Sequence, residues 1–223
     1  MKVILQTLTL IFTLPIGLWG QMETEPGEEA IQQHHRAVHL LPDTWMRDPY
    51  IYRGPAGTYY LTYTTGKDNI PLWQSSNLVD WTQLPDPYRL SDASNYAAYQ
   101  ASLAARQRAN PDFKGHLKVW APELYFLDGR WIYIHTSNVR SGNLAWVEGE
   151  DPILPKQDWG NSFGHQHDPS IFTDEDGSHW LVAKCASIQR IKADWSGFEG
   201  EPIKLGPSDR KLGHEGCFIL KYG

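Results

Sequence analysis

The chain has 223 residues, of which 26 are acidic and 20 are basic, and its formal charge is −6. This length suits one domain or part of a larger one, and the 41% hydrophobic fraction excludes a disordered chain. An acidic chain without a basic stripe lacks the phosphate contacts that nucleic-acid binding needs. The ten Trp and eleven Tyr residues are typical of sugar binding through ring stacking, and equally of a β-rich core.

The first 20 residues have the pattern of a secretory signal peptide. Lys2 supplies a positive charge, residues 3–14 are mostly apolar, and Gly20 precedes the polar Gln21. The apolar run is too short to span a membrane, and no later segment reaches 18 uninterrupted apolar residues. We therefore expect residues 1–20 to be removed and the mature protein to be secreted or periplasmic, without a membrane span.

A repeated pattern defines one domain at residues 43–223, which a lead-in segment at residues 21–42 precedes. The pattern is an x-Pro-x step, a short aliphatic or aromatic run, a Gly turn and a second run, which together predict a β-hairpin. The complete copies occupy residues 48–63, 121–134 and 168–182. The later copies start at residues 121, 168 and 215, one every 47 residues, and this period predicts the four-stranded blades of a propeller.

The fold class is therefore all-β, with about three and a half blades in this sequence. Small propellers with this period close with four or five blades, so we expect the chain to be the N-terminal part of a longer domain. The missing part would be roughly 80 to 150 residues. The first interval is longer than the others because an Ala-rich stretch at residues 93–109 predicts a helix inserted between blades.

The two cysteines, Cys185 and Cys217, leave two interpretations open. An exported protein permits a disulfide bond between them, and each is equally well explained as a small buried side chain. The sequence contains no CxxC motif, and the spacing of its His and Cys residues does not resemble a zinc site.

Carboxylates recur at one position of the repeat. Alignment of the copies places Asp48, Ala121, Asp168 and Glu215 at the residue that opens the innermost strand of each blade. Inner strands run along the central channel, so these positions converge at its mouth. Like charges brought together cost free energy, and such a cost is typical of functional sites. The group predicts either glycoside hydrolysis or a calcium site.

Four further residues immediately precede these positions: Arg47, Trp120, His167 and His214. Neighbouring residues of a strand face opposite sides, so these side chains would pack between the blades. At the channel mouth, however, they could bind sugar hydroxyls. Both interpretations stay open for this group, which we keep as candidate substrate-binding residues. Three other tryptophans are interpreted as blade core in preference to sugar platforms: Trp45, Trp73 and Trp159.

The order of these motifs resembles glycoside hydrolase family 43 over residues 43–223. The motifs that carry the resemblance are Arg47-Asp48-Pro49, Trp120-Ala121-Pro122, His167-Asp168-Pro169 with its Ser-Ile-Phe continuation, and His214-Glu215-Gly216. The resemblance implies a five-bladed β-propeller of the clan that also holds families 62, 32, 68 and 117. It further implies an inverting mechanism with Asp48 as general base, Glu215 as general acid, and Asp168 as the residue that orients the acid and raises its pKa.

The implied function is an exported glycoside hydrolase that acts on plant or algal oligosaccharides or polysaccharides, with arabinofuranosidase-, xylosidase- or galactosidase-like specificity. Two departures are Cys217 where the family usually has Pro, and Arg47 where Ala is commoner. The alternatives are a non-catalytic carbohydrate-binding propeller, a protein-interaction platform, and a family 117-like or family 32-like hydrolase. No cofactor is expected, with a structural calcium ion in the channel as the alternative.

Overall fold

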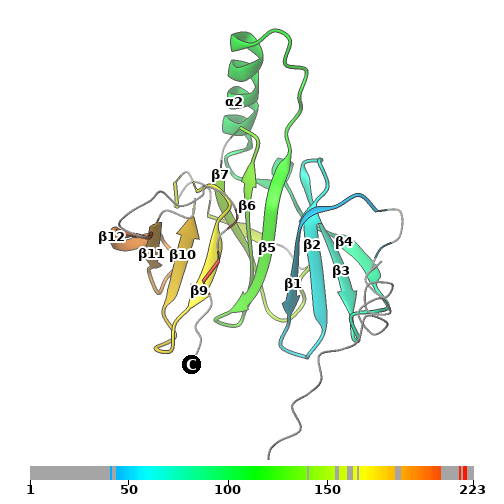
Figure 1. The fold of residues 1–223 in the computed structure, drawn as a ribbon, viewed down its shortest axis with the longest axis vertical. Helices are drawn as coiled ribbons and strands as arrows, with labels where there is room; N and C mark the ends of the chain where they lie inside the picture. Colours follow the sequence, from blue (N-terminus) through cyan, green and yellow to red (C-terminus); the bar gives the residue numbers. More distant parts are fainter. Residues whose placement is uncertain are drawn as a thin grey trace, which may run out of the picture. The chain divides into compact units, whose positions relative to one another are not determined.

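Three four-stranded antiparallel sheets make up most of the described structure (Figure 1). This computed structural model describes residues 41, 44–139, 141–153, 156–159, 163–164, 166–183, 187–206, 216 and 218–219. The expected signal peptide, both cysteines, and the predicted residues His214 and Glu215 lie outside the described residues.

Each sheet is a meander in which the strands pair in chain order. The first sheet contains β1 (Arg47–Arg53), β2 (Tyr59–Thr64), β3 (Asn69–Ser75) and β4 (Thr82–Arg89). The second contains β5 (Val119–Leu127), β6 (Arg130–Ser137), β7 (Ser141–Glu148) and β8 (Lys156–Asp158). The third contains β9 (Ser170–Thr173), β10 (His179–Ala183), β11 (Ser187–Ile191) and β12 (Phe198–Lys204). The three predicted hairpins are therefore confirmed as the first two strands of three separate sheets, which have the topology of propeller blades.

A 3-10 turn, η1 (Leu90–Asp92), and the helix α2 (Tyr96–Ala109) lie between the first and second blades. The helix ends where the sequence predicts but begins three residues later than Ala93. The reason is that the Asp92 carboxylate accepts a hydrogen bond from Arg89 N at 2.9 Å, which closes the 3-10 turn instead of capping the helix.

The inserted helix is attached to the second blade. Arg106 Nη1 donates to Asn138 O at 2.7 Å, and Ser94 N donates to Asp158 Oδ2 at 2.7 Å. Tyr99 is fully buried in the core between the first two blades. Among the described residues, no helix has the length and apolarity needed to cross a membrane.

Trp131 is the centre of the core between the first and second blades. Its ring is fully buried and meets three rings edge-on, with centroid distances of 4.8 Å to Tyr60, 5.4 Å to Phe126 and 6.0 Å to Tyr52. The backbone at Gly54 passes so close that a Cβ there would lie 2.8 Å from the Tyr60 ring and 3.0 Å from Trp131. Only glycine fits this position without displacing the rings.

The second and third blades meet at a clamp around Trp195. This buried indole stacks on Trp159 at 5.5 Å and donates from Nε1 to Asp128 Oδ2 at 3.0 Å. The same oxygen lies 3.2 Å from His179 Nε2. Asp128 belongs to the hairpin turn of the second blade, so this turn binds directly to the third blade. The core interpretation of Trp159 agrees with its packing here.

Replacing the central ring should weaken the chain more than replacing a tryptophan of β10, the equivalent strand of the third blade. Trp131→Ala should lower the free energy of unfolding by about 3–5 kcal/mol, because it opens a cavity between two blades. Trp180→Ala should cost clearly less, since Trp180 is only partly buried. Chemical denaturation of the full chain, followed by circular dichroism, measures both losses. Equal losses would show that Trp131 is not the centre of the core.

Candidate active site

The residue that opens each blade has an unusual backbone conformation. Asp48, Ala121 and Asp168 have φ angles of 51°, 42° and 45°. L-residues other than glycine rarely adopt this left-handed region, although Asp enters it more readily than Ala. Each such residue costs on the order of 1–3 kcal/mol and persists only where its surroundings hold it.

β-bulges accompany this conformation in the first two blades. The register of β1 against β2 shifts between Arg47 and Tyr50, and that of β5 against β6 shifts between Trp120 and Glu123. A bulge adds one residue to a strand and changes the direction of the neighbouring side chains. Strict alternation ends there, so consecutive residues can face the same cavity.

Two threonine hydroxyls hold the opening residues in place. At the end of β2, Thr64 Oγ1 donates to Asp48 Oδ2 at 2.9 Å and accepts from Ala121 N at 2.9 Å. Thr136 has the same position in β6, where its Oγ1 accepts from Asp168 N at 2.7 Å and donates to Asp168 Oδ1 at 3.4 Å. Both threonines are buried. Each one therefore joins the second strand of its own blade to the opening residue of the next blade.

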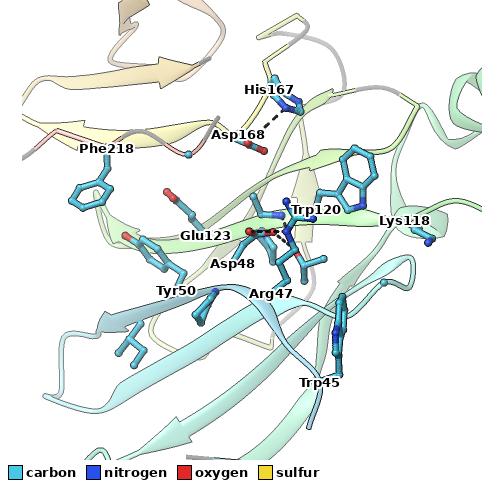
Figure 2. A pocket seen from close by; sticks show the side chains of 17 residues that line it. Trp45, Arg47, Asp48, Tyr50, Lys118, Trp120, Glu123, His167, Asp168 and Phe218 are labelled. Carbon is cyan, nitrogen blue, oxygen red and sulfur yellow. Dashed lines mark hydrogen bonds and ion pairs between the residues drawn. The ribbon is translucent and has the colours of Figure 1, made fainter. Parts of the chain in front are cut away.

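The opening residues line a pocket of ≈ 870 Å3 (Figure 2). Five of the predicted site residues line it: Arg47, Asp48, Trp120, His167 and Asp168. Arg47 Nε lies 3.4 Å from Asp48 Oδ1, and His167 Nε2 lies 3.7 Å from Asp168 Oδ2. The candidate substrate-binding residues of the described chain thus face the pocket and do not belong only to blade packing, because bulges interrupt the alternation in β1 and β5.

Glu123 is a pocket carboxyl group that the sequence analysis did not select. Burial raises the pKa of Glu123 to about 7, against the lowering effect of hydrogen bonds from Tyr125 and Ser170, and the charge of Asp168 adds to the rise. The available signal was its position two residues after Ala121, because residues i and i+2 of a strand share a face.

Trp45 lies at the pocket and not in the blade core. Its side chain is 64% exposed and lines the pocket, so the core interpretation is wrong for this tryptophan. Trp45 precedes β1 and is therefore not part of the sheet. Gly66, in the turn after β2, lies close to its ring: a Cβ at Gly66 would be 3.7 Å from Trp45 Cζ3.

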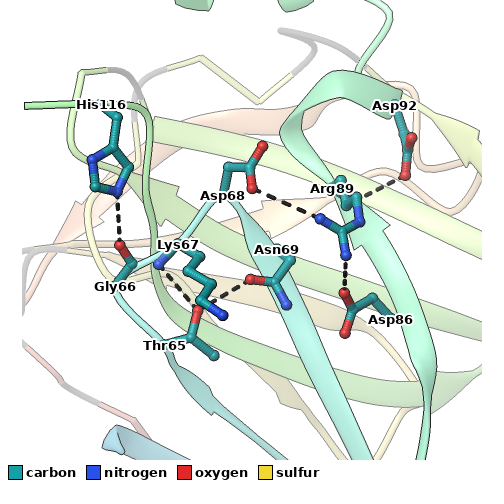
Figure 3. A network of polar contacts seen from close by, with 9 residues as sticks. All are labelled: Thr65, Gly66, Lys67, Asp68, Asn69, Asp86, Arg89, Asp92 and His116. Atoms are coloured by element: carbon teal, nitrogen blue, oxygen red, sulfur yellow. Dashed lines mark hydrogen bonds and ion pairs between the residues drawn. The ribbon is translucent and has the colours of Figure 1, made fainter.

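A polar network stabilises the turn between β2 and β3, which borders the pocket (Figure 3). His116 Nε2 lies 3.2 Å from the carbonyl oxygen of Gly66. Arg89 Nη2 binds Asp86 Oδ2 at 2.5 Å, and Arg89 Nη1 lies 4.0 Å from Asp68 Oδ1. The rim of the pocket is therefore tied both to β4 and to the segment that enters the second blade.

The calcium alternative gains no support from the described part of the chain. There, no three His, Cys, Asp or Glu side chains are grouped closely enough to hold a metal ion. The carboxylates of the pocket instead bind protein hydroxyl groups.

Three meander sheets and a pocket lined by their opening residues define a β-propeller with a carboxylate site at the channel. A family model described as Glycosyl hydrolases family 43 matches residues 43–221. The chain therefore belongs to glycoside hydrolase family 43. No match was found among curated proteins.

Solved structures of family 43 enzymes share the fold. The GH43 BlXynB protein of Bacillus licheniformis has a TM-score of 0.55 at 19% identity, over 76% of this chain and 33% of its own. Xylan β-1,4-xylosidase of Bacillus halodurans C-125 has a TM-score of 0.55 at 20% identity, over 77% and 34%. Endo-arabinase of Bacteroides thetaiotaomicron VPI-5482 has a TM-score of 0.52 at 21% identity, over 72% and 56%. The chain thus spans about a third to just over half of these proteins, and the similarity confirms the predicted all-β propeller fold.

The threonine links should be necessary for stability. Thr136→Val keeps the shape of the side chain but leaves the N–H of Asp168 without its acceptor, so we expect a loss of about 1–3 kcal/mol in the free energy of unfolding. Thr136→Ser keeps the hydroxyl and should lose less. Denaturation of both variants provides the measurement, and a Val variant as stable as the wild type would show that the link is not required.

Proposed function

We propose that the protein is a glycoside hydrolase that cleaves O-glycosidic bonds of oligosaccharides or polysaccharides with inversion at the anomeric carbon. The observation that carries the proposal is the delivery of Asp48 and Asp168 by separate blades into one pocket of a family 43 chain. A propeller that only binds sugar does not require two carboxylates from separate blades at that pocket.

Asp48 is the proposed general base. Its carboxylate is oriented by the Thr64 hydroxyl at 2.9 Å and by Arg47 at 3.4 Å, and it faces the pocket where water and sugar would meet. In this role it takes a proton from the water that attacks the anomeric carbon. The Arg residue that departs from the common family pattern therefore has a place beside the base.

Glu215 is the proposed general acid and Asp168 its positioning residue. As the bond between the anomeric carbon and the leaving oxygen breaks, Glu215 gives its proton to that oxygen, and the product has the opposite anomeric configuration. A negative charge on Asp168 would help Glu215 to keep its proton until then. Glu215 lies outside the described residues, and the support for its role is the family motif.

We further propose arabinose-, xylose- or galactose-containing glycans of plants or algae as substrates, and export as the destination. The similar structures include a xylosidase and an endo-arabinase by their names, which supports the proposed substrates. The charged and apolar pattern of residues 1–20 supports export.

The full-length protein should lose hydrolysis when its carboxylates are replaced. Asp48→Asn should lower kcat about 10²- to 10⁴-fold on every substrate, because no water is activated. Glu215→Gln should have the same effect on sugars with poor leaving groups but spare activated aryl glycosides. Asp176→Asn, in an exposed turn, is the matched control.

Rates on aryl arabinofuranosides, xylosides and galactosides, with product anomers followed by NMR, test these roles. Full activity of the Asp48 variant would refute the assignment of the base. Retention of configuration would favour the family 32-like alternative, and binding without any hydrolysis would favour the carbohydrate-binding propeller.

Trp45 should bind a second sugar unit. An exposed indole at a pocket offers a stacking face, and aromatic stacking is worth about 0.5–1.5 kcal/mol. Trp45→Ala should therefore raise KM for oligosaccharides about 3- to 10-fold and leave KM for aryl monosaccharides unchanged. Trp45→Phe should retain most of the affinity. An equal rise in KM for both substrate classes would place Trp45 outside this role.

A further inference from the structure

The channel is lined by a second layer of residues, two positions after the opening residue of each blade. In the three blades these are Tyr50, Glu123 and Ser170. Tyr50 and Glu123 line the pocket (Figure 2), whereas Ser170 is buried. The second blade has no carboxylate in its opening position, Ala121, but supplies one in the second layer.

The carboxyl group of Glu123 is held by Tyr125 of its own strand, and the third blade fixes Tyr125. Glu123 Oε2 accepts a hydrogen bond from the hydroxyl of Tyr125, which is itself buried. This hydroxyl accepts from Ile171 N at 3.0 Å and lies 3.2 Å from Ser170 Oγ. One side of the carboxyl group is thus fixed by a buried network, and the other side belongs to the pocket.

The charges around Glu123 favour its neutral form. Burial raises its pKa to about 7, and Asp168 contributes to that rise. Burial also raises the pKa values of Tyr50 and Tyr125, so both phenols keep their protons. The other ionisable residues that line the pocket are Arg47, Asp48, Lys118 and His167. Among these groups, Asp48 is paired with Arg47, and His167 lies beside Asp168.

We propose that Glu123 is a substrate-contacting residue that donates a hydrogen bond to an oxygen of the sugar in the pocket. A sugar presents hydroxyl groups that donate and oxygens that accept. Asp48 and Asp168 can receive the donated bonds, but the accepting oxygens require a donor, which a protonated carboxyl group supplies. The ligand class is a neutral sugar with an oxygen acceptor at that position, and this part rests on the proposed function.

Two variants separate this role from a structural one. Glu123→Gln has nearly the shape of the neutral acid and keeps a donor, so the full-length variant should bind xylose, arabinose or galactose within about threefold of the wild-type affinity. Glu123→Leu lacks the donor and should weaken that binding about 10- to 100-fold, with the same change in kcat/KM. Glu201→Gln, on the exposed strand β12, is the matched control for the loss of a carboxyl group.

The pH dependence provides a readout that a structural role would not change. The carboxyl group of Glu123 loses its proton as the pH rises through about 7, so wild-type affinity for the sugar should fall between about pH 6 and pH 8. Glu123→Gln does not titrate, and its affinity should stay constant over this range. The infrared difference spectrum between the two proteins at pH 6 should contain the protonated carboxyl band of Glu123, because every other carboxyl group is common to both and cancels.

Calorimetry of the binding of the three monosaccharides to each full-length variant tests whether Glu123 donates this hydrogen bond. The inference fails if Glu123→Gln loses as much affinity as Glu123→Leu, which would assign the ionised form, or if Glu123→Leu binds sugar like the wild type. If either result is found while the wild type hydrolyses glycosides normally, only the role of Glu123 is refuted, and the proposed function stands. If the variants differ as expected but the wild type hydrolyses no glycoside, the proposed function fails and the sugar-binding role of Glu123 stands.

Discussion

The hydrogen bond that a threonine hydroxyl accepts from the N–H of the opening residue of the next blade is the interaction on which the rest of the site depends. Thr64 and Thr136 each use this bond to join two blades, and each also binds an aspartate carboxylate. The same atoms therefore set how neighbouring blades meet and where the carboxylates point. Blade packing and site geometry are coupled in this chain because one buried hydroxyl serves both.

Most of the fold was predictable because its signals are local. Gly turns between short β-branched and aromatic runs mark the hairpins, and the 47-residue period assigns each hairpin to a separate blade. The convergence of Asp48 and Asp168 also followed from the sequence, because rotation about a propeller axis brings equivalent residues of successive blades together. The roles of these residues rest on the family motif and stay predictions.

The rest of the site was not predictable because it depends on the register between strands. The bulges in β1 and β5 interrupt the two-residue alternation, so Arg47 and Trp120 face the pocket together with the residues that follow them. The raised pKa of Glu123 depends on burial and on the charge of Asp168 from another blade, and the sequence reveals neither of these. The place of Trp45 before the first hairpin was visible in the sequence, but its exposure at the pocket was not.

Ala121 separates the shape of the site from its chemistry. It adopts the same left-handed conformation as Asp48 and Asp168, and its N–H donates to a threonine hydroxyl as that of Asp168 does, yet it carries no functional group. The conformation is therefore a property of the repeated scaffold and not of the aspartate side chain. In such a propeller, a blade can lose the carboxylate of its opening residue and carry one two residues later, as the second blade does with Ala121 and Glu123, without a change in its backbone. Duplicated blades with a common frame can in this manner evolve a site that has no internal symmetry.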